Sequence, residues 1–383
     1  MKAFSIPRPQ IAIVAAALIA DELGSAFGKH VDTLTAASWW AETPIQEGGA
    51  DLSGDEAAAV RLRALRFFGV EPKAQPGTPS KIGDWVDEIA ASIDRRLTSF
   101  SFAAAGENAP EYAHQADAIF AGAAAASNLL YGRRRVLSLI SPHSLIGFTL
   151  TVLSPNLLNT PSVDVRGMAP DELKKFLSFG DALIATPSLW RYVIAQGIVA
   201  PDNAMAVFFG EAMTPQLSAE IRKAGFNAQR EIYGSTEHGL IAWRDSPGDP
   251  FALFDHWSRC DEKLSRRAPS GEHADVEPMD RFVWEGDRRF RLGGRRDGAV
   301  QIGGINIFPE RIAQRISEHP AVASCVVELS KEEAGGDRLV AAISLHENGS
   351  PAESVARSID AWCRAKLRPH ERPRLYNYVE ARK

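Results

Sequence analysis

The feature that most constrains this chain is a change of pattern near Arg135. From there to about residue 210, short apolar runs alternate with helical segments, and the runs read RVLSLIS, TLTVLS, DALIATP and AVFFG. Short apolar runs bounded by Pro, Gly and Asn are typical of buried strands, and their alternation with helices is typical of a largely parallel sheet covered on both faces. The sequence therefore predicts an α/β fold with mostly parallel strands in this region.

The segments on either side follow other patterns. Residues 1 to about 98 have helical periodicity interrupted by clusters of Gly, Pro and Ser, and the polar stretch at 265–278 predicts a long surface loop. After Arg295 a helical run, PERIAQRISEH, precedes two apolar runs that predict paired strands, ASCVVEL and LVAAISL. We therefore expect a large N-terminal domain over residues 1–295 and a small C-terminal α+β domain over residues 296–383.

Charge and cysteine content narrow the classes of partner and site. The chain carries 43 Lys and Arg against 48 Asp and Glu, a net charge of −5, whereas nucleic-acid binders normally carry a basic excess. Its cysteines, Cys260, Cys325 and Cys363, lie far apart and form no CxxC pair. We therefore expect no nucleic-acid partner, no disulfide framework, no zinc site and a reducing, cytoplasmic location.

One apolar segment near the N-terminus resembles the core of a signal peptide. It reads IAIVAAALIA at 11–20 and runs directly into Asp21 and Glu22, and Pro7 and Pro9 lie before it. A membrane span needs about 20 consecutive apolar residues, which no stretch of the chain reaches. We interpret the segment as an alanine-rich helix packed against the protein, with a signal peptide as the alternative.

Three segments carry residue types that suit a nucleotide. In YGSTE at 233–237, backbone N–H groups and the Thr hydroxyl can donate to phosphate oxygens, and the Glu carboxylate can hold Mg²⁺. The alternative is a turn whose Ser or Thr caps the next helix. GEA at 210–212 ends a predicted strand, where parallel sheets bind ligands. RRDGAVQIGG at 295–304 follows several other arginines, which are also consistent with a solvated basic face.

The order and spacing of these segments resemble the adenylate-forming superfamily, which includes the acyl- and aryl-CoA ligases. Within it, the chain is similar to the short 4-coumarate–CoA ligase family associated with photoactive yellow protein. The resemblance covers roughly residues 135–373. It rests on TPSLW at 186–190, FFGEAMTPQL at 208–217, EIYGSTEHGLIAWR at 231–244 and RFRLGGRRDGAVQIGGINIFPERI at 289–312.

The resemblance implies a nucleotide site in the large domain. Its adenine would lie against Gly210, Glu211 and Ala212 and beside Tyr233 and Gly234. Thr236 would contact the α-phosphate, and Glu237 would coordinate Mg²⁺.

The resemblance also implies roles near the domain boundary. Asp280 and Arg295 would hold the ribose hydroxyls, although Asp280 is also readable as an ordinary loop residue and Asp287 is a rival for its role. Asp297 would lie on the hinge about which the small domain rotates between half-reactions. Gly303 and Gly304 would let the backbone approach the thiol arm of CoA.

A third set of residues would form the acid pocket. His143, which follows Pro142, and Gly147 resemble the family segment that gates the acyl group, and Phe148 and Trp190 would wall an aromatic acid. Each has a plainer interpretation: a lone His is more often an ordinary buried or surface side chain, and the two aromatic residues are equally readable as core.

The family implies an ATP-dependent ligase that uses Mg²⁺ and CoA. A p-coumarate-like carboxylate would attack the α-phosphorus of ATP, and a thiol would then displace AMP from the acyl-adenylate. The alternatives are loading of the acid onto an acyl carrier protein, or a catalytically impaired homologue that binds AMP or acyl-adenylate.

Two departures from the family pattern support the impaired alternative. The phosphate loop should fall at 102–111, where Ala replaces most of the Ser and Thr and Glu111 replaces the Lys. An anion beside a triphosphate repels it. At the other end, Lys383 is the candidate for the family's C-terminal lysine, and a terminal residue is usually mobile.

Overall fold

The computed structural model describes residues 5–72, 79–94, 97–104, 110–268, 271–302, 305–330, 338–346 and 353–379. The chain forms two compact units. The first is Met1–Pro278 with Trp284–Arg291, and the second is Met279–Val283 with Leu292–Lys383. Each unit encloses a hydrophobic core of its own, as independently folded domains do.

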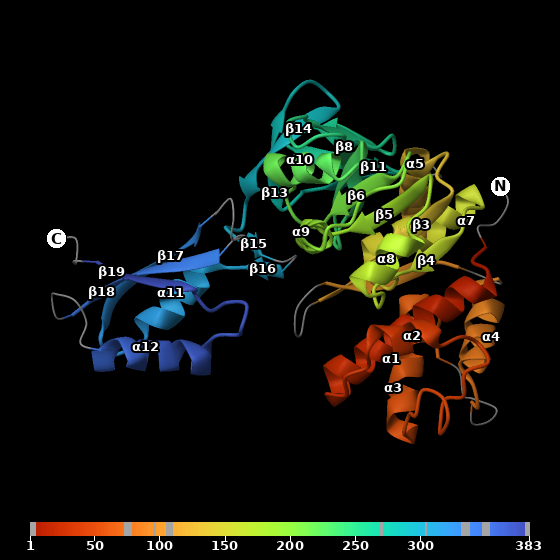
Figure 1. Cartoon of the computed structure of the whole chain (residues 1–383), viewed down its shortest axis with the longest axis horizontal. Coiled ribbons are helices and arrows are strands. Elements are labelled where there is room, and N and C mark those ends of the chain that lie inside the picture. Colours follow the sequence, from red (N-terminus) through yellow and green to blue (C-terminus); the bar gives the residue numbers. More distant parts are fainter. Residues whose placement is uncertain are drawn as a thin grey trace. The chain divides into compact units, whose positions relative to one another are not determined.

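The first unit contains a helical layer and an α/β layer (Figure 1). Its helices are α1 (Arg8–Phe27), α2 (Thr33–Ser38), α3 (Gly54–Phe67), α4 (Ile82–Ile93), α5 (Ala116–Leu130), α6 (Leu145–Gly147), the π-helix η1 (Phe148–Leu153), α7 (Ser154–Leu158), α8 (Pro170–Phe176), α9 (Pro187–Ala195) and α10 (Pro215–Lys223).

The strands that begin in the first unit fall in three sheets. They are β1 (Ser99–Ala103), β2 (Glu111–Gln115), β3 (Arg135–Ser138), β4 (Ser162–Asp164), β5 (Asp181–Ala185), β6 (Met205–Phe209), β7 (Ala228–Ser235), β8 (Gly239–Arg244), β9 (Phe251–Leu253), β10 (Trp257–Cys260), β11 (Lys263–Arg267), β12 (His273–Val276) and β14 (Arg289–Arg295). A further strand, β13 (Asp280–Trp284), pairs with β14, and this hairpin passes from the first unit into the second.

Helix α1 is the apolar segment identified near the N-terminus. Contrary to the expectation that no stretch reaches the length of a membrane span, this helix, alone among the described residues, is long and apolar enough to cross a membrane. Half of its most apolar stretch is buried inside the protein. Ile11, Val14 and Ile19 have no exposed surface, and α1 packs against α3 and α4. The segment therefore forms the packed helix that we expect from its sequence.

The main sheet has the order β13-β14-β9-β8-β7-β6-β5-β3-β4. Strands β4, β3, β5, β6 and β7 are parallel, and β7, β8, β9 and β14 pair antiparallel. This confirms the α/β prediction and adds an antiparallel extension. Helices α8, α9 and α10 lie on one face of the parallel strands, where Leu183, Trp190 and Phe226 share a core (Figure 1).

The order of the parallel strands predicts a ligand site near the candidate residues. The next two strands in the chain, β4 and β5, pair with opposite edges of β3. The strand order therefore reverses between β3 and β5. Ligands of such sheets bind beyond the carboxyl ends of the strands at this reversal. At the neighbouring ends, Thr186 and Thr214 cap α9 and α10 by accepting backbone N–H bonds of 3.3 and 3.2 Å, and each precedes a proline at the first helical position.

Two sequence predictions in the first unit are wrong. The run TLTVLS predicts a strand but lies in η1, where the hydroxyls of Thr149 and Thr151 donate to carbonyls four residues earlier, at 2.8 and 2.7 Å. Short, fully buried apolar runs look alike in helices and strands, which explains the error. The predicted surface loop at 265–278 contains parts of β11 and β12, which pair antiparallel. Their polar side chains gave them the composition of a loop.

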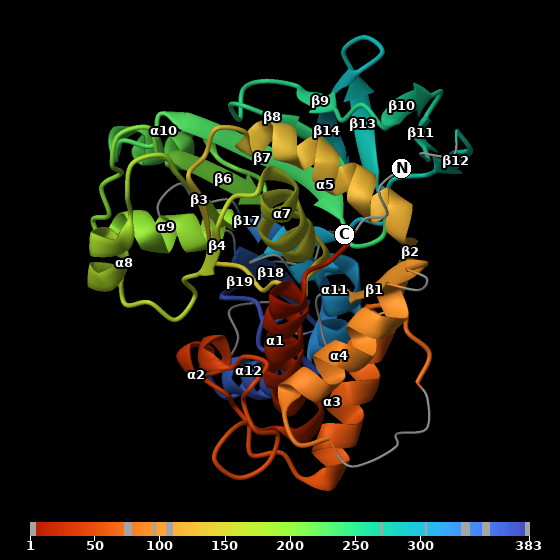
Figure 2. The same ribbon diagram turned by 90° about the vertical axis from the view of Figure 1, so that its right-hand side faces the viewer.

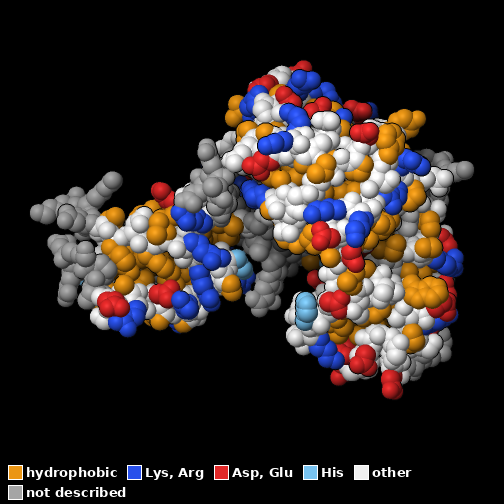
Figure 3. All heavy atoms as spheres, in the orientation of Figure 1, with side chains coloured by type: hydrophobic (Ala, Val, Ile, Leu, Met, Phe, Trp, Pro, Cys, Tyr) orange, Lys and Arg blue, Asp and Glu red, His pale blue; other side chains and the backbone are white. Residues whose placement is uncertain are grey.

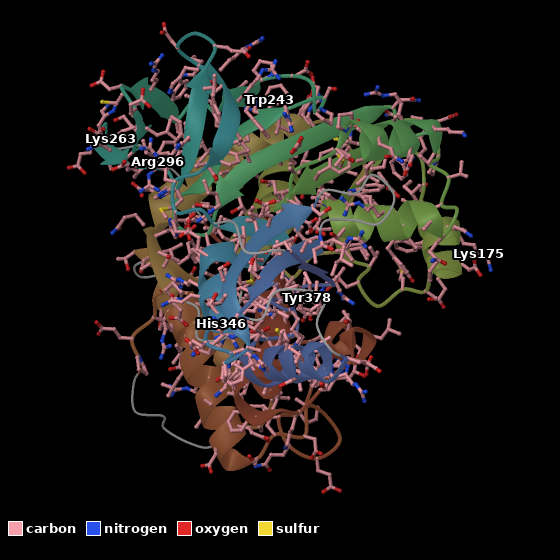
Figure 4. All side chains as sticks on the ribbon, turned by 90° about the vertical axis from the view of Figure 1, so that its left-hand side faces the viewer. Lys175, Trp243, Lys263, Arg296, His346 and Tyr378 are labelled. Carbon is pink, nitrogen blue, oxygen red and sulfur yellow. The ribbon has the colours of Figure 1, made fainter. Side chains whose placement is uncertain are left out.

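The second unit contains β15 (Val300–Ile302), β16 (Ile305–Ile307), α11 (Pro309–Ser317), β17 (Val322–Ser330), β18 (Arg338–Leu345), α12 (Glu353–Lys366) and β19 (Leu375–Tyr378). Strands β17 and β18 pair antiparallel, as the sequence predicts, and β19 adds a parallel strand beside β18. Tyr378 lies on this last strand and His346 follows β18 (Figure 4). Helices α11 and α12 pack against the sheet through the buried side chains of Ile312, Ile316 and Ile359.

Candidate active site

The YGSTE segment forms the end of β7 and the turn into β8. The backbone closes tightly there, because a Cβ on Gly234 would lie 2.4 Å from the carbonyl oxygen of Gly239. Gly239 has φ of +83°, and the Ser235 hydroxyl accepts the His238 N–H at 3.3 Å. A strand, not a helix, follows this turn, so the structure does not support the helix-cap alternative. We call residues 235–239 the β7–β8 turn.

The β1–β2 hairpin holds this turn from one side and packs between α3 and α5 (Figure 2). The His114 ring donates from Nε2 to the Thr236 carbonyl oxygen at 2.7 Å, and the Tyr112 hydroxyl donates to the Glu237 carboxylate. Burial, helped by the Glu237 charge, raises the pKa of Tyr112. Because side chains two apart on a strand share a face, Tyr112 and His114 together fix the two residues proposed to contact phosphate and metal.

Our sequence reasoning did not identify Tyr112 or His114. Their alternation in EYAHQ shows that they share a face, but it does not reveal a partner more than a hundred residues away. The hairpin stands where the family's phosphate loop is expected; of that stretch, residues 105–109 lie outside the described residues. Phe102 is buried in an aromatic cluster, and Glu111 forms an exposed ion pair with Arg66 at 3.5 Å.

Three half-buried basic side chains lie at the β7–β8 turn: His238 of the turn itself, His256 and Arg266. Together with residues of α5 and the start of β8, these side chains line a cavity of about 10 Å³. This volume is enough for one water molecule. Burial lowers the pKa of His238 and Arg266, and it lowers the pKa of His256 to about 4. At neutral pH these histidines are therefore uncharged, and Arg266, whose guanidinium lies 5.7 Å from the Trp257 ring centre, carries the positive charge of the cavity.

The GEA segment follows β6 at its carboxyl end. Gly210 has φ of +86°, and the Glu211 carboxylate accepts a 2.7 Å hydrogen bond from the Ser188 hydroxyl on α9. Within the described part of the chain, the other Glu211 oxygen, Oε1, is buried and accepts no hydrogen bond. A buried acceptor without a donor is costly unless a ligand supplies one, and the exocyclic amine of adenine is such a donor.

Tyr233 forms an aromatic group with neighbouring strands. Its ring centre lies 5.5 Å from that of Phe251 on β9 and 5.7 Å from that of Phe290 on β14. The Tyr233 ring is only half-buried, so part of it is open to a flat ligand.

The residues predicted to form the acid pocket do not share one environment. Phe148 and Trp190 have no exposed surface: Phe148 packs among Phe67, Phe100 and Phe102, and the Trp190 indole donates to the Val207 carbonyl at 3.1 Å. The structure therefore favours the core interpretation for both.

The proposed gate follows β3, with His143 in the loop and Gly147 at the end of α6. Gly147 is required there, because a Cβ would lie 1.9 Å from the Ser141 carbonyl oxygen. His143 Nδ1 lies 2.7 Å from the Ser141 hydroxyl. Pro142, next to it in the chain, lines a cavity of about 370 Å³, which also borders one face of α1. Cavities of this size hold small organic molecules.

The boundary residues belong to the second unit. Arg295 forms a two-pronged ion pair with Asp297 at 2.9 and 2.7 Å, and Asp297 also accepts the Ala299 N–H at 3.1 Å. The hydrogen bonds from Arg295 lower the pKa of Asp297. Asp280 begins β13, and Gly303 and Gly304 lie outside the described residues, as does Lys383.

The described residues fit a magnesium ion that arrives with a nucleotide. They contain no group of three or more His, Cys, Asp or Glu side chains arranged to hold a metal. Magnesium in nucleotide sites needs only one or two protein carboxylates, because phosphates and water supply the other ligands. Glu237, held by Tyr112, is suited to be such a carboxylate.

Comparisons with known proteins point to one superfamily. Residues 311–382 match the AMP-binding enzyme C-terminal domain. The chain is 29% identical to a 4-coumarate–CoA ligase from Halorhodospira halophila over 93% of this chain and 92% of the relative. It is 31% identical to one from Rhodobacter capsulatus over 64% of this chain and 61% of that relative.

Solved structures agree on the fold. An amide bond synthetase from Marinactinospora thermotolerans matches 97% of this chain and 90% of its own with a TM-score of 0.57 and 14% identity. A malonyl-CoA ligase complex matches 74% and 71% with a TM-score of 0.52 and 17% identity. The chain is therefore similar in sequence to the 4-coumarate–CoA ligases, and it shares its fold with these solved ligase and synthetase structures.

Proposed function

We propose that this protein is an AMP-forming acid–thiol ligase that activates an aryl carboxylic acid similar to p-coumarate and transfers it to CoA. The observation that carries the proposal is the set of groups at the carboxyl ends of β6 and β7. Glu211 presents a buried acceptor, Tyr233 a half-buried ring, and the β7–β8 turn a hydroxyl and a carboxylate, each fixed by neighbouring strands or helices. These groups match the base, the α-phosphate and the metal of one nucleotide.

The chemistry has two half-reactions. In the first, a carboxylate oxygen of the acid attacks the α-phosphorus of ATP, the bond to the β-phosphate oxygen breaks, and pyrophosphate leaves. The Thr236 hydroxyl donates to the α-phosphate as negative charge develops there. Glu237 would hold Mg²⁺, and the ion would supply positive charge to the phosphates. In the second, the CoA sulfur attacks the activated carbonyl, the thiol loses its proton, and AMP leaves.

The remaining assignments are also proposals. We assign Gly210, Glu211, Ala212, Tyr233 and Gly234 to the base. For the second unit, we retain Asp280 and Arg295 for the ribose, Asp297 for the hinge and Gly303 and Gly304 for the approach of CoA. Fixing Arg295 against Asp297 limits the orientations of its guanidinium, which suits a group that must meet a ribose in one geometry.

We also propose a cytoplasmic location. Cys260, Cys325 and Cys363 are free thiols, and burial raises the pKa of Cys325 to about 12 and also that of Cys363, so both resist oxidation. On the face of the first unit shown in Figure 3, basic and acidic side chains are interspersed. Such a surface offers no continuous basic patch to a polyanion, in keeping with small-molecule partners.

The test is release of AMP from ATP in the presence of Mg²⁺, CoA and a panel of aryl acids. We expect release with p-coumarate or a related hydroxycinnamate or hydroxybenzoate, and none when the acid is omitted. A folded protein that releases no AMP with any acid of the panel, and with neither CoA nor a carrier protein as acceptor, would refute the proposal.

A further inference from the structure

His143, the proposed gate of the acid pocket, is held from two sides by polar side chains. Its Nδ1 lies 2.7 Å from the Ser141 hydroxyl, and its Nε2 lies 3.7 Å from a carboxylate oxygen of Asp21 on α1. The histidine side chain is 17% exposed and the aspartate 43% exposed, so the aspartate is the more exposed of the two. The N-terminal helical layer therefore reaches the loop that follows β3.

Asp21 is itself held by a second helix. Arg63 on α3 donates from one guanidinium nitrogen to Asp21 and from the other to the neighbouring Glu22. The bond to Glu22 is 2.7 Å long. Burial alone would raise the pKa of Asp21, but His143 and Arg63 outweigh it and the pKa is lowered. Asp21 therefore stays a carboxylate at neutral pH and faces the histidine ring as an anion.

An anion beside one ring nitrogen determines where the proton of a neutral imidazole resides. Asp21 favours the proton on Nε2, which leaves the lone pair of Nδ1 to accept the Ser141 hydroxyl. The 3.7 Å contact is longer than a hydrogen bond, so the carboxylate acts on the ring through its charge. Ser141 and Asp21 together thus select one state of His143.

The same face of α1 borders the larger cavity. Gln10, Ile13 and Ala17 line it, and Asp21 lies one turn beyond Ala17 on that face. Pro142 contributes to the wall of this cavity, and His143 follows it in the chain. One helix thus supplies both a wall of the cavity and the carboxylate that faces the proposed gate.

We propose that Asp21 is a positioning residue that fixes the tautomer and orientation of His143, and that α1 thereby takes part in admission of the acid. This inference rests on the proposed function, in which His143 gates the acid pocket. It assigns to the N-terminal helices a part in the reaction that no motif in their sequence indicates.

The chain offers a matched pair of variants to test it. Asp21→Asn and Glu22→Gln each keep the size of the side chain and remove one carboxylate partner of Arg63, but only the first removes the anion that faces His143. Two quantities are measured: the ring ¹⁵N signals of His143, identified by their loss in His143→Gln, and kcat and KM for p-coumarate from AMP release. Thermal unfolding of both variants reports any shared loss of stability.

We expect Asp21→Asn to change the ring signals and to raise KM for p-coumarate, or lower kcat, by about tenfold, as loss of a group that orients a functional histidine does. Glu22→Gln should leave both within about twofold, and Asp21→Glu should restore part of the loss. Unchanged ring signals in Asp21→Asn, or equal kinetic effects of the two variants, would overturn the inference. A wild-type protein that releases no AMP would instead refute the proposed function, and the ring signals would still decide whether Asp21 fixes His143.

Discussion

The two hairpins that meet at the proposed phosphate site contribute different things. The β7–β8 turn carries Thr236 and Glu237, whose hydroxyl and carboxylate suit phosphate and magnesium. The β1–β2 hairpin stands where related enzymes are expected to carry a phosphate loop, yet its described residues provide a tyrosine, a histidine and a glutamate paired with an arginine. We propose from this difference that the first hairpin supports the second, and that the groups that contact phosphate and metal lie on the β7–β8 turn.

The largest effect on activity is expected when the carboxylate of the β7–β8 turn is removed. Glu237→Gln keeps the shape of the side chain but withdraws the charge that would hold Mg²⁺, so AMP release should fall by about 100-fold. The initial rate of AMP release at several Mg²⁺ concentrations measures the effect. A rate within threefold of wild type would show that the metal is held elsewhere.

The contact between the hairpins should also weaken in acid. Burial lowers the pKa values of His114, His238 and His256, so the unfolded chain binds more protons than the folded one as pH falls from about 6.5 to 4. The contribution of these neutral rings is complete above pH 6.5, and the free energy of unfolding should fall by about 1 to 3 kcal/mol between pH 7 and pH 5.

Denaturant unfolding at the two pH values measures this loss. His256→Gln removes one of the three titrating rings and should reduce the difference between the two pH values. Equal stability at pH 7 and pH 5 in the wild-type protein would contradict the assignment of these rings as buried and neutral.

The supporting role of the first hairpin is tested more finely at Tyr112. Tyr112→Phe removes the hydroxyl that orients Glu237 and keeps the ring, so AMP release should fall by about tenfold and more Mg²⁺ should be needed for half-maximal rate. Tyr131→Phe is the control, because Tyr131 is 79% exposed at the end of α5. The account fails at this point if both variants keep the wild-type Mg²⁺ dependence.

The smallest expected effect is at Glu111. Glu111→Lys reverses a charge beside the proposed triphosphate, so KM for ATP should fall by about threefold. Stability should barely change, because the exposed pair with Arg66 contributes less than about 1 kcal/mol. Glu111→Gln separates removal of the anion from addition of a cation. If neither variant lowers KM for ATP, electrostatic repulsion at this position does not limit the reaction.

Much of the fold follows from local pattern, whereas the contacts that complete the site do not. The apolar runs RVLSLIS, DALIATP and AVFFG predict β3, β5 and β6, and the YGSTE segment predicts hydroxyls and a carboxylate at the end of a strand. By contrast, the partners of that turn, Tyr112 and His114, lie on a strand remote in sequence. Asp21, which faces His143, and Arg63, which pairs with Asp21, come from two helices of the N-terminal layer. Such pairs depend on how layers pack, which no local pattern records.

Phe148 and Trp190 illustrate a second limit of sequence reasoning. An aromatic residue next to a functional motif looks the same in the sequence whether its side chain lines a pocket or fills a core. Only the packing around it decides, and here both rings are enclosed by other aromatic or apolar groups. The pattern therefore identifies the segments near the site more reliably than the side chains that face the substrate.

The central claim, that the β7–β8 turn supports adenylation, is tested most directly by exchange of labelled pyrophosphate into ATP without CoA. This measurement isolates the first half-reaction. The account predicts exchange that depends on both p-coumarate, or a related aryl acid, and Mg²⁺. Absence of exchange with every acid tested, by a folded protein that still binds AMP, would contradict the claim.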